Sequence, residues 1–314
     1  MLRPFLAMAT SDFDLLVVGD ANPDVIISGT PRTPAFGQRE QLVETGELVL
    51  GGSGAITACG AARLGLRTAF VGRVGDDDAG AVTLDALTRR GVDVSACVVD
   101  RAAATALTVV LVDGSDRAIL TAPGCLDRLD AADVPAELLA RAAHVHASSY
   151  FLQPRLAAGL PDLFRAARAG GATTSLDTND DPSGRWQGLD KVLELTDILL
   201  PNDREALALA GRTDGDLDRA VRDLAERGLT PVIKRGADGA LAFADGEPIR
   251  VPALPARVVD TVGAGDSFNA GLLAGHLRGL PLRRSLALAV ACGTLSTRAA
   301  GGTAAQPTWE EVTR

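Results

Sequence analysis

The sequence contains little lysine and few aromatic residues. Its 314 residues include two lysines, Lys191 and Lys234, and aromatic residues make up only 4%. The formal net charge of -9 and the pI near 4.9 argue against a nucleic-acid-binding protein, because such proteins need a basic field to collect phosphates. Any phosphate is therefore expected to bind at a local site.

Cysteine and long apolar runs are scarce as well. The four cysteines form no C-x-x-C pair, which indicates buried free thiols rather than a zinc site or a disulfide framework. No apolar stretch has the length needed to span a bilayer, and residues 1–9 lack a secretory pattern. We predict a soluble, cytoplasmic protein with no membrane partner.

Apolar runs of strand length alternate with segments of helical spacing. The expected strands are residues 14–20, 68–72, 143–147, 173–177, 197–200 and 231–234. The expected helices are residues 53–64, 79–90, 154–169, 203–210, 216–227, 264–277 and 282–299. This alternation predicts an α/β fold with a mainly parallel sheet covered on both faces.

Two segments interrupt the alternation. Residues 25–50 and 94–121 contain extended pieces and turns with little helix, so we predict that they pair into a separate small sheet. The whole chain, residues 1–314, is treated as one domain with this appendage. A small exposed sheet often needs a partner along its edge, which favours a homodimer through this sheet.

The stretch Asp260-Thr-Val-Gly-Ala-Gly-Asp-Ser-Phe-Asn-Ala-Gly271 is the most informative in the chain. Gly263, Ala264 and Gly265 precede an apolar run of helical spacing, which places a helix start at this point. The first amides of a helix and its dipole suit an anion, and Asp266 lies in the first turn, where it could accept a proton from a hydroxyl. Taken alone, the pattern also fits a turn followed by a helix-capping acid.

Three other pairs of polar residues have two interpretations each. Asn202 and Glu205 share one face at an expected helix start, as metal-organising residues or as a capping box would. Asp177 and Asn179 end a strand and could either contact a substrate or cap a turn. His144 and His146 lie on one face of another strand, and we interpret them as core residues rather than as metal ligands.

The stretch from Asp260 to Gly271 resembles the C-terminal signature of the ribokinase-like (PfkB) carbohydrate kinases. Five further segments, in the same order along residues 14–307, are similar to other motifs of that family: residues 19–24, 51–77, 176–179 with Trp186, 201–205 and 232–239. The resemblance implies a ribokinase-like three-layer α/β/α fold. It also implies that residues 25–50 and 94–121 form a β lid over the substrate.

The resemblance implies an activity as well. The expected reaction is ATP-dependent phosphorylation of a primary hydroxyl of a small sugar or sugar acid, with Asp266 as the general base. The amides of Gly263, Ala264 and Gly265 would stabilise the charge on the transferred group. The positions that match the family's substrate-binding residues are Asp24, Gly51, Gly52, Asp177 and Asn179.

The same resemblance implies binding sites for ATP and Mg²⁺, and K⁺ is a candidate third cofactor. Asn202, Lys234 and Gly236 would bind the nucleotide together with Gly263 and Gly265. Glu205 would hold Mg²⁺ through water. Asp260 would contribute to a monovalent cation site, although a turn-capping role explains it equally well. Lys234 also fits a plain surface turn, whereas the motif explains Gly236 better.

One position departs from the family pattern. Many relatives carry an asparagine that contacts the substrate four residues after the glycine pair, where this chain has Ile56. The substrate's polar pattern is therefore expected to differ on that side, which argues against plain ribose. A nucleoside kinase and a noncatalytic sugar-binding regulator remain alternatives. A dinucleotide-dependent oxidoreductase is set aside, because Gly19-Asp-Ala-Asn-Pro-Asp24 is not G-x-G-x-x-G.

Overall fold

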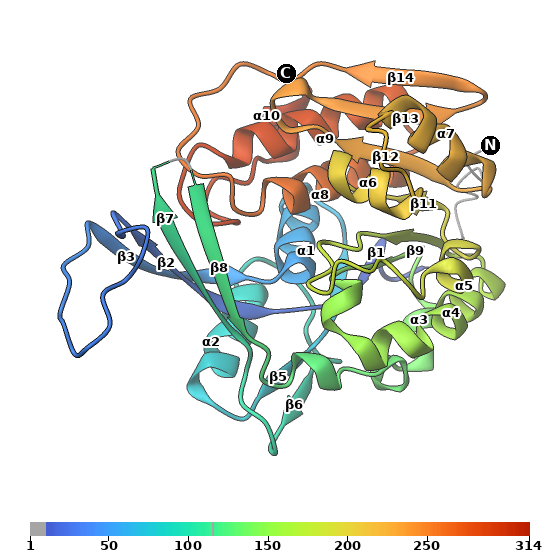
Figure 1. Ribbon diagram of the computed structural model, residues 1–314. Helices are drawn as coiled ribbons and strands as arrows, with labels where there is room; N and C mark the ends of the chain where they lie inside the picture. Colours follow the sequence, from blue (N-terminus) through green and yellow to red (C-terminus); the bar gives the residue numbers. More distant parts are fainter. Residues whose placement is uncertain (1–10, 115) are drawn as a thin grey trace.

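A computed structural model describes residues 11–114 and 116–314, and within them the chain forms one large sheet, a four-stranded sheet and a two-stranded sheet (Figure 1). The order of strands in the large sheet is β14-β13-β12-β11-β10-β9-β1-β4. These strands are β1 (Leu15–Val18), β4 (Thr68–Val71), β9 (His144–Ala147), β10 (Thr173–Leu176), β11 (Ile198–Leu199), β12 (Thr230–Lys234), β13 (Ala240–Ala244) and β14 (Glu247–Val251).

The six strands from β12 to β4 are parallel to one another. Leu15 and Val17 of β1 pack into one core, and Leu16 and Val18 into the other, because successive side chains of a strand point to opposite faces. The mainly parallel sheet is confirmed. The antiparallel hairpin β13–β14 at its edge was not expected from the sequence.

Helices cover both faces of the large sheet. One core includes residues of α1 (Ser53–Arg63), α2 (Asp78–Thr88), α8 (Ala264–Leu277) and α9 (Leu282–Ser296), and α10 (Trp309–Thr313) packs against it. The opposite core includes residues of α3 (Ala136–Ala140), α4 (Pro154–Ala169), α5 (Asp190–Leu193), α6 (Asp203–Leu209) and α7 (Leu217–Glu226). The described residues also include the 3₁₀ turns η1 (Leu126–Arg128), η2 (Ala131–Asp133), η3 (Tyr150–Leu152) and η4 (Gly236–Asp238). The fold is therefore the expected three-layer α/β/α arrangement.

The four-stranded sheet stands apart from the large sheet and is the small separate sheet that the sequence predicted as a lid (Figure 1). Its order is β3-β2-β7-β8, from β2 (Asn22–Ser28), β3 (Thr45–Gly51), β7 (Leu107–Asp113) and β8 (Asp116–Ala122). The lid therefore starts at residue 22 rather than 25. The second lid segment starts at residue 107 rather than 94, because β6 (Val98–Asp100) pairs with β5 (Arg73–Gly75) in the two-stranded sheet.

Two groups of core residues behave as the sequence suggested. His144 and His146 are fully buried and bond to the hydroxyls of Thr173 and Ser175 at 2.7–2.8 Å. Burial lowers the pKa of His146 to about 4, so this histidine is neutral near pH 7. The four cysteines are free thiols, three of them buried and Cys97 partly buried. Within the described residues, no helix is both long and apolar enough to cross a membrane.

Candidate active site

Several polar residues, four of them predicted for the site, lie at the carboxyl ends of the parallel strands. Asp20 follows β1, Asp177 and Asn179 follow β10, Asn202 follows β11, and Lys234 ends β12. The N-terminus of α8 joins them, because Lys234 lies beside Gly265. In open α/β sheets, this edge is where ligands bind.

The turn before α8 has the form expected of an anion site. Gly263 has a left-handed backbone (φ 70°), and an added Cβ would lie 2.5 Å from the Cα of Gly302, so only glycine fits. The N–H groups of Gly263 and Gly265 donate no hydrogen bond to the described residues, and that of Ala264 reaches only the Thr261 carbonyl at 3.3 Å. The turn therefore presents free donors and the positive end of the α8 dipole.

Asp266 is partly buried in the first turn of α8. Burial and the neighbouring charge of Asp177 raise the pKa of Asp266 to about 7, although a hydrogen bond from Ser53 and the charge of Lys234 lower it. The Ser53 hydroxyl donates to Oδ1 of Asp266 at 2.5 Å, whereas no partner among the described residues bonds to Oδ2. A carboxylate that titrates near neutral pH beside free amides has the properties of a general base.

Asp20 fixes the start of α1 next to Asp266. Its carboxylate accepts the N–H groups of Ser53 and Gly54 at 2.9 and 3.0 Å and the Ser148 hydroxyl at 3.1 Å. Gly52 has a φ of 88°, and an added Cβ would lie 2.7 Å from the Asp20 carbonyl oxygen. Glycine is therefore required at position 52 because the chain passes close to the Asp20 backbone, whereas contact of Gly52 with a substrate stays a prediction.

Lys234 lies among carboxylates rather than at the surface. Its ammonium group bonds to Oδ2 of Asp177 at 2.5 Å, and its side chain is 15% exposed, whereas that of Asp177 is fully buried. Burial lowers the pKa of Lys234, but Asp177, Glu205 and Asp266 outweigh that effect and raise it, so the lysine is charged. The alternative of a solvated surface lysine is excluded.

The carboxylate of Asp177 is held by protein donors. Oδ2 also accepts the side-chain amide of Asn269 at 2.6 Å, and Oδ1 accepts the N–H of Asn179 at 3.2 Å. The side-chain nitrogen Nδ2 of Asn179 donates to the Ser53 hydroxyl at 3.1 Å. Both residues thus bond to other site residues, and direct contact of either with a substrate stays a prediction.

Asn202 and Glu205 form the capping box of α6. The N–H of Glu205 donates to the Asn202 side chain at 2.9 Å, and the N–H of Asn202 donates to the Glu205 carboxylate at 2.8 Å. Burial and Asp177 raise the pKa of Glu205, against the opposing charge of Lys234. The structure therefore shows the capping role of Glu205, and the binding of a metal ion by the same carboxylate stays a prediction.

Asp24 and Gly51 meet at the base of the lid. Asp24 lies in β2, is buried, and accepts the Asn22 amide at 2.7 Å. A Cβ on Gly51 would lie 2.0 Å from Oδ1 of Asp24, so the glycine makes room for this carboxylate. Burial raises the pKa of Asp24 to about 7 and the Asn22 hydrogen bond opposes the shift. Two residues predicted separately therefore form one feature.

Gly236 and Asp260, two further residues predicted for the site, lie outside the strands of the large sheet. Gly236 begins the 3₁₀ turn η4 with a φ of 51°, and nothing stands within 4 Å of an added Cβ. Asp260 accepts the N–H groups of Val262 at 2.9 Å and Gly301 at 2.8 Å, one on each oxygen. Asp260 therefore ties two loops together, as a turn-capping residue does.

Ile56 lies beneath the anion-binding turn. It is buried, and its side chain stands within 3.1 Å of the positions that Cβ atoms of Gly263 and Gly302 would occupy. An apolar side chain here packs on glycine backbone and offers no hydrogen bond. The departure from the family pattern is thus accommodated by packing.

Three further residues take part that sequence reasoning did not select. Ser53, Asp20 and Asn269 bond directly to Asp266, to the start of α1 and to Asp177, respectively. Ser53 and Asp20 lie inside segments recognised as motifs, so their positions were noted without a role. Asn269 lies one turn after Gly265 in the helical pattern, and its three-residue offset from Asp266 was the available signal.

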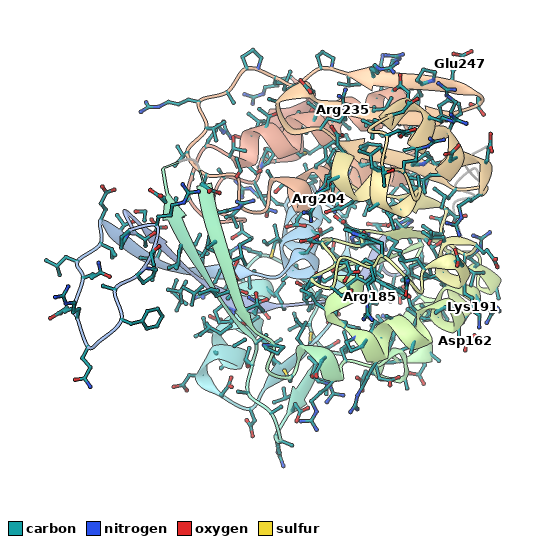
Figure 2. All side chains as sticks on the ribbon, viewed as in Figure 1. Asp162, Arg185, Lys191, Arg204, Arg235 and Glu247 are labelled. Carbon is teal, nitrogen blue, oxygen red and sulfur yellow. The ribbon has the colours of Figure 1, made fainter. Side chains whose placement is uncertain are left out.

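Arginines surround the same edge but are engaged in ion pairs. Arg204 pairs with Asp180, and Arg235 lies 3.4 Å from Asp203. Figure 2 labels both arginines. Lys234 is therefore the basic residue that contacts the site carboxylates most closely among the described residues.

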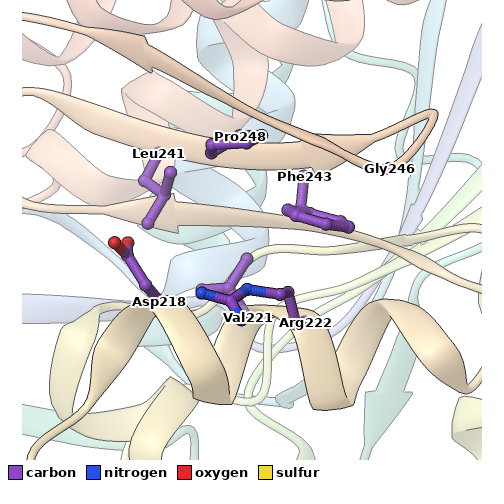
Figure 3. A pocket seen from close by; sticks show the side chains of 7 residues that line it. All are labelled: Asp218, Val221, Arg222, Leu241, Phe243, Gly246 and Pro248. Atoms are coloured by element: carbon purple, nitrogen blue, oxygen red, sulfur yellow. The ribbon is translucent and has the colours of Figure 1, made fainter.

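A hollow of about 330 Å³ lies elsewhere, between α7 and the β13–β14 hairpin (Figure 3). Apolar side chains line it, including Val221, Leu241 and Phe243, and Asp218 at its rim pairs with Arg250 at 2.6 Å. Its lining includes none of the residues that were predicted for the active site.

The fold and this constellation define a phosphotransferase: free amides at a helix start, a carboxylate that titrates near pH 7, and a lid sheet. The model of the pfkB family of carbohydrate kinases matches residues 12–309. The chain belongs to this family, and it is an ATP-dependent kinase of a sugar or nucleoside.

Individual relatives agree. The chain is 33% identical over 279 residues to a fructokinase of Klebsiella pneumoniae, which covers 84% of this chain and 91% of that protein. A ribokinase of Arabidopsis thaliana solved with ribose and ATP superimposes with a TM-score of 0.83 at 27% identity, covering 96% and 97% of the two chains. A chain described as a ribokinase II of E. coli, solved with ATP and Mg²⁺, gives a TM-score of 0.86 at 25% identity and covers 96% and 98%.

Proposed function

We propose that this protein transfers the γ-phosphoryl group of ATP to a primary hydroxyl of a small sugar or sugar acid, with Asp266 as the general base. The observation that carries the proposal is the placement of Asp266 next to the free N–H groups of Gly263 and Gly265. The carboxylate takes the hydroxyl proton, and the amides stabilise charge on the transferred group. The fructokinase and ribokinase relatives support a sugar as the acceptor.

The lid supports a sugar rather than a nucleoside. The face of the lid that carries Asp24 also carries Thr108 and Thr121, whose hydroxyls lie 3.2 Å apart, and the aliphatic Ile26 and Val110. A carboxylate and hydroxyls suit a polyol. No aromatic side chain lies on these four strands to stack on a base. A nucleoside is the second candidate within the family, and a noncatalytic regulator the third.

The nucleotide would bind along Asn202, Lys234, Gly236 and the Gly263–Gly265 turn. Glu205 would hold Mg²⁺ through water, which fits a single buried carboxylate next to Lys234. Asp260 would contribute to a K⁺ site, since each of its oxygens accepts only one N–H. When bound, Mg²⁺ neutralises charge on the phosphates.

We further propose a homodimer through the lid. Leu48, Val25, Val109 and Leu120 are register partners in a row across all four strands, on the face opposite to Asp24. Leu48 is 64% exposed and Leu120 is 58% exposed, so this apolar face is uncovered in one copy. Leu120→Asp should yield monomers in sedimentation, whereas Leu254→Asp, outside the lid, should not. A wild-type monomer at micromolar concentration would contradict the dimer.

The activity is tested by ADP release from MgATP with fructose, ribose, 2-keto-3-deoxygluconate, other hexoses and nucleosides. Asp266→Asn should lower kcat by about 10²–10⁴-fold and leave ATP binding intact. Asp162→Asn, a substitution of an exposed carboxylate that pairs only with Arg165, is the matched control. Turnover that survives Asp266→Asn would refute the role of the base. Bound ATP with no turnover on any acceptor would favour the regulator.

A further inference from the structure

A chain of hydrogen bonds leads from the end of β9 to Asp266. The N–H of Ser149 donates to Oδ1 of Asn179 at 2.9 Å, and Nδ2 of Asn179 donates to the Ser53 hydroxyl at 3.1 Å. The Ser53 hydroxyl in turn donates to Oδ1 of Asp266 at 2.5 Å. The bonds thus connect the ends of β9 and β10, through the start of α1, to one carboxylate oxygen of α8.

In this series of hydrogen bonds, the donor and acceptor of each bond follow from the bond before it. A backbone N–H can only donate, so the Asn179 side chain must present its oxygen to Ser149 and its NH₂ group to Ser53. The Ser53 oxygen therefore accepts from Asn179, and its single proton is directed toward Asp266. The first two bonds keep this polarity whatever the protonation state of Asp266, and an ionised Asp266 can only accept the Ser53 proton at Oδ1.

The backbone at the first two residues of this hydrogen-bond chain adopts a disfavoured conformation. Ser149 and Asn179 have φ values of 54° and 53°, in the left-handed region that non-glycine residues rarely enter. Such conformations persist where the surrounding structure holds them, and they cluster at functional sites. Ser53 is fixed independently, because its N–H is bonded to Asp20.

We propose that Ser53 is the positioning residue of the base: its hydroxyl holds Oδ1 of Asp266 and leaves Oδ2 to accept the proton of the sugar hydroxyl. This inference rests on the proposed function. In the step, the sugar O–H bond breaks and its proton passes to Oδ2. The sugar oxygen then forms a bond to the γ-phosphorus, and the bond between that phosphorus and the ADP oxygen breaks.

The same hydrogen bond favours the ionised base. The charged groups that face Asp266 are Asp177, Lys234 and Asp20, of which the two aspartates raise its pKa and the lysine lowers it. The Ser53 bond also lowers the pKa of Asp266, so its removal should raise that pKa further. Because only the ionised form accepts a proton, activity at low pH should fall most.

The test is the pH dependence of sugar phosphorylation by Ser53→Ala, Ser53→Thr and Asn179→Gly, with Ser296→Ala as the control. Ser296 is buried and its hydroxyl bonds within α9, far along the chain from this network. In Ser53→Ala the acid limb of kcat/KM should move up by about one pH unit, so that kcat/KM at pH 6.5 falls roughly eightfold. Asn179→Gly, which tolerates the left-handed backbone, should shift the limb in the same direction, and Ser53→Thr should restore it.

A folded Ser53→Ala enzyme with the wild-type acid limb would overturn the inference, even if its kcat were lower. A raised KM for the sugar in Asn179→Gly, with no change in the limb, would overturn it as well, because Asn179 would then contact the substrate. These outcomes differ from failure of the proposed function, in which Asp266→Asn itself retains turnover.

Discussion

Removal of the Lys234 charge is the sharpest perturbation of this site. Lys234→Met keeps a side chain of similar length and leaves Asp177 as a fully buried carboxylate without its cation. Removing one partner of a buried ion pair typically destabilises a protein by about 3–5 kcal/mol. Little discount for solvent applies here, because the lysine side chain is only 15% exposed. The free energy of unfolding should therefore fall by about that amount.

The measurement is urea denaturation followed by circular dichroism, with two comparisons. Lys191→Met, at the chain's other lysine, is the matched control: Lys191 is exposed on α5, so its replacement should change stability by less than about 0.5 kcal/mol. The double variant Lys234→Met/Asp177→Asn should recover at least half of the loss. The amide that replaces the carboxylate carries no charge and can still accept the bond from Asn269.

The reasoning would be refuted by a loss below about 1 kcal/mol in Lys234→Met, the level of an exposed ion pair. It would also be refuted by a double variant no more stable than the single one. That second result would mean that the loss comes from packing of the lysine stem rather than from the unpaired charge.

Three further predictions concern the substrate pocket and pH. Gly51→Ala should raise the KM for the sugar at least about tenfold, because the added Cβ overlaps the Asp24 carboxylate. Gly46→Ala on the same strand, where nothing stands within 4 Å of an added Cβ, should leave the KM unchanged, and equal effects of the two substitutions would contradict a substrate pocket at Asp24. The kcat/KM of the wild type should rise with pH through a limb near pH 7, since the pKa of Asp266 is raised to about 7 and its ionised form is the active one. The pKa of Asp24 is raised above the ordinary 3.8, so the stability that this carboxyl contributes is present at low pH and lost as pH rises toward 7. Asp24→Asn should therefore flatten the decline of the unfolding free energy between about pH 4 and 7, and an unchanged slope would assign that decline to other groups.

Much of the fold followed from local pattern. The buried strands of the sheet and the helices between them were predicted because apolar periodicity and length are properties of short windows, and the α8 start was marked by its glycines. The β13–β14 hairpin was missed because its exposed, polar outer strand has no clear alternation. The early part of the second lid segment was misplaced because strand pairing is a long-range choice, and β6 selects β5.

The sequence by itself determined most of the elements and the family, and it singled out Asp266 as the candidate base, since each of these depends on residues close together in the chain. Only the tertiary structure decided which side chains meet. It placed Lys234 against Asp177, set Gly51 beside Asp24, and brought Ser53 to Asp266 from 213 residues away. Burial is likewise a tertiary property, so the shift of the Asp266 pKa toward 7 follows from the packing of β1, β10, β12 and α8 around one carboxylate.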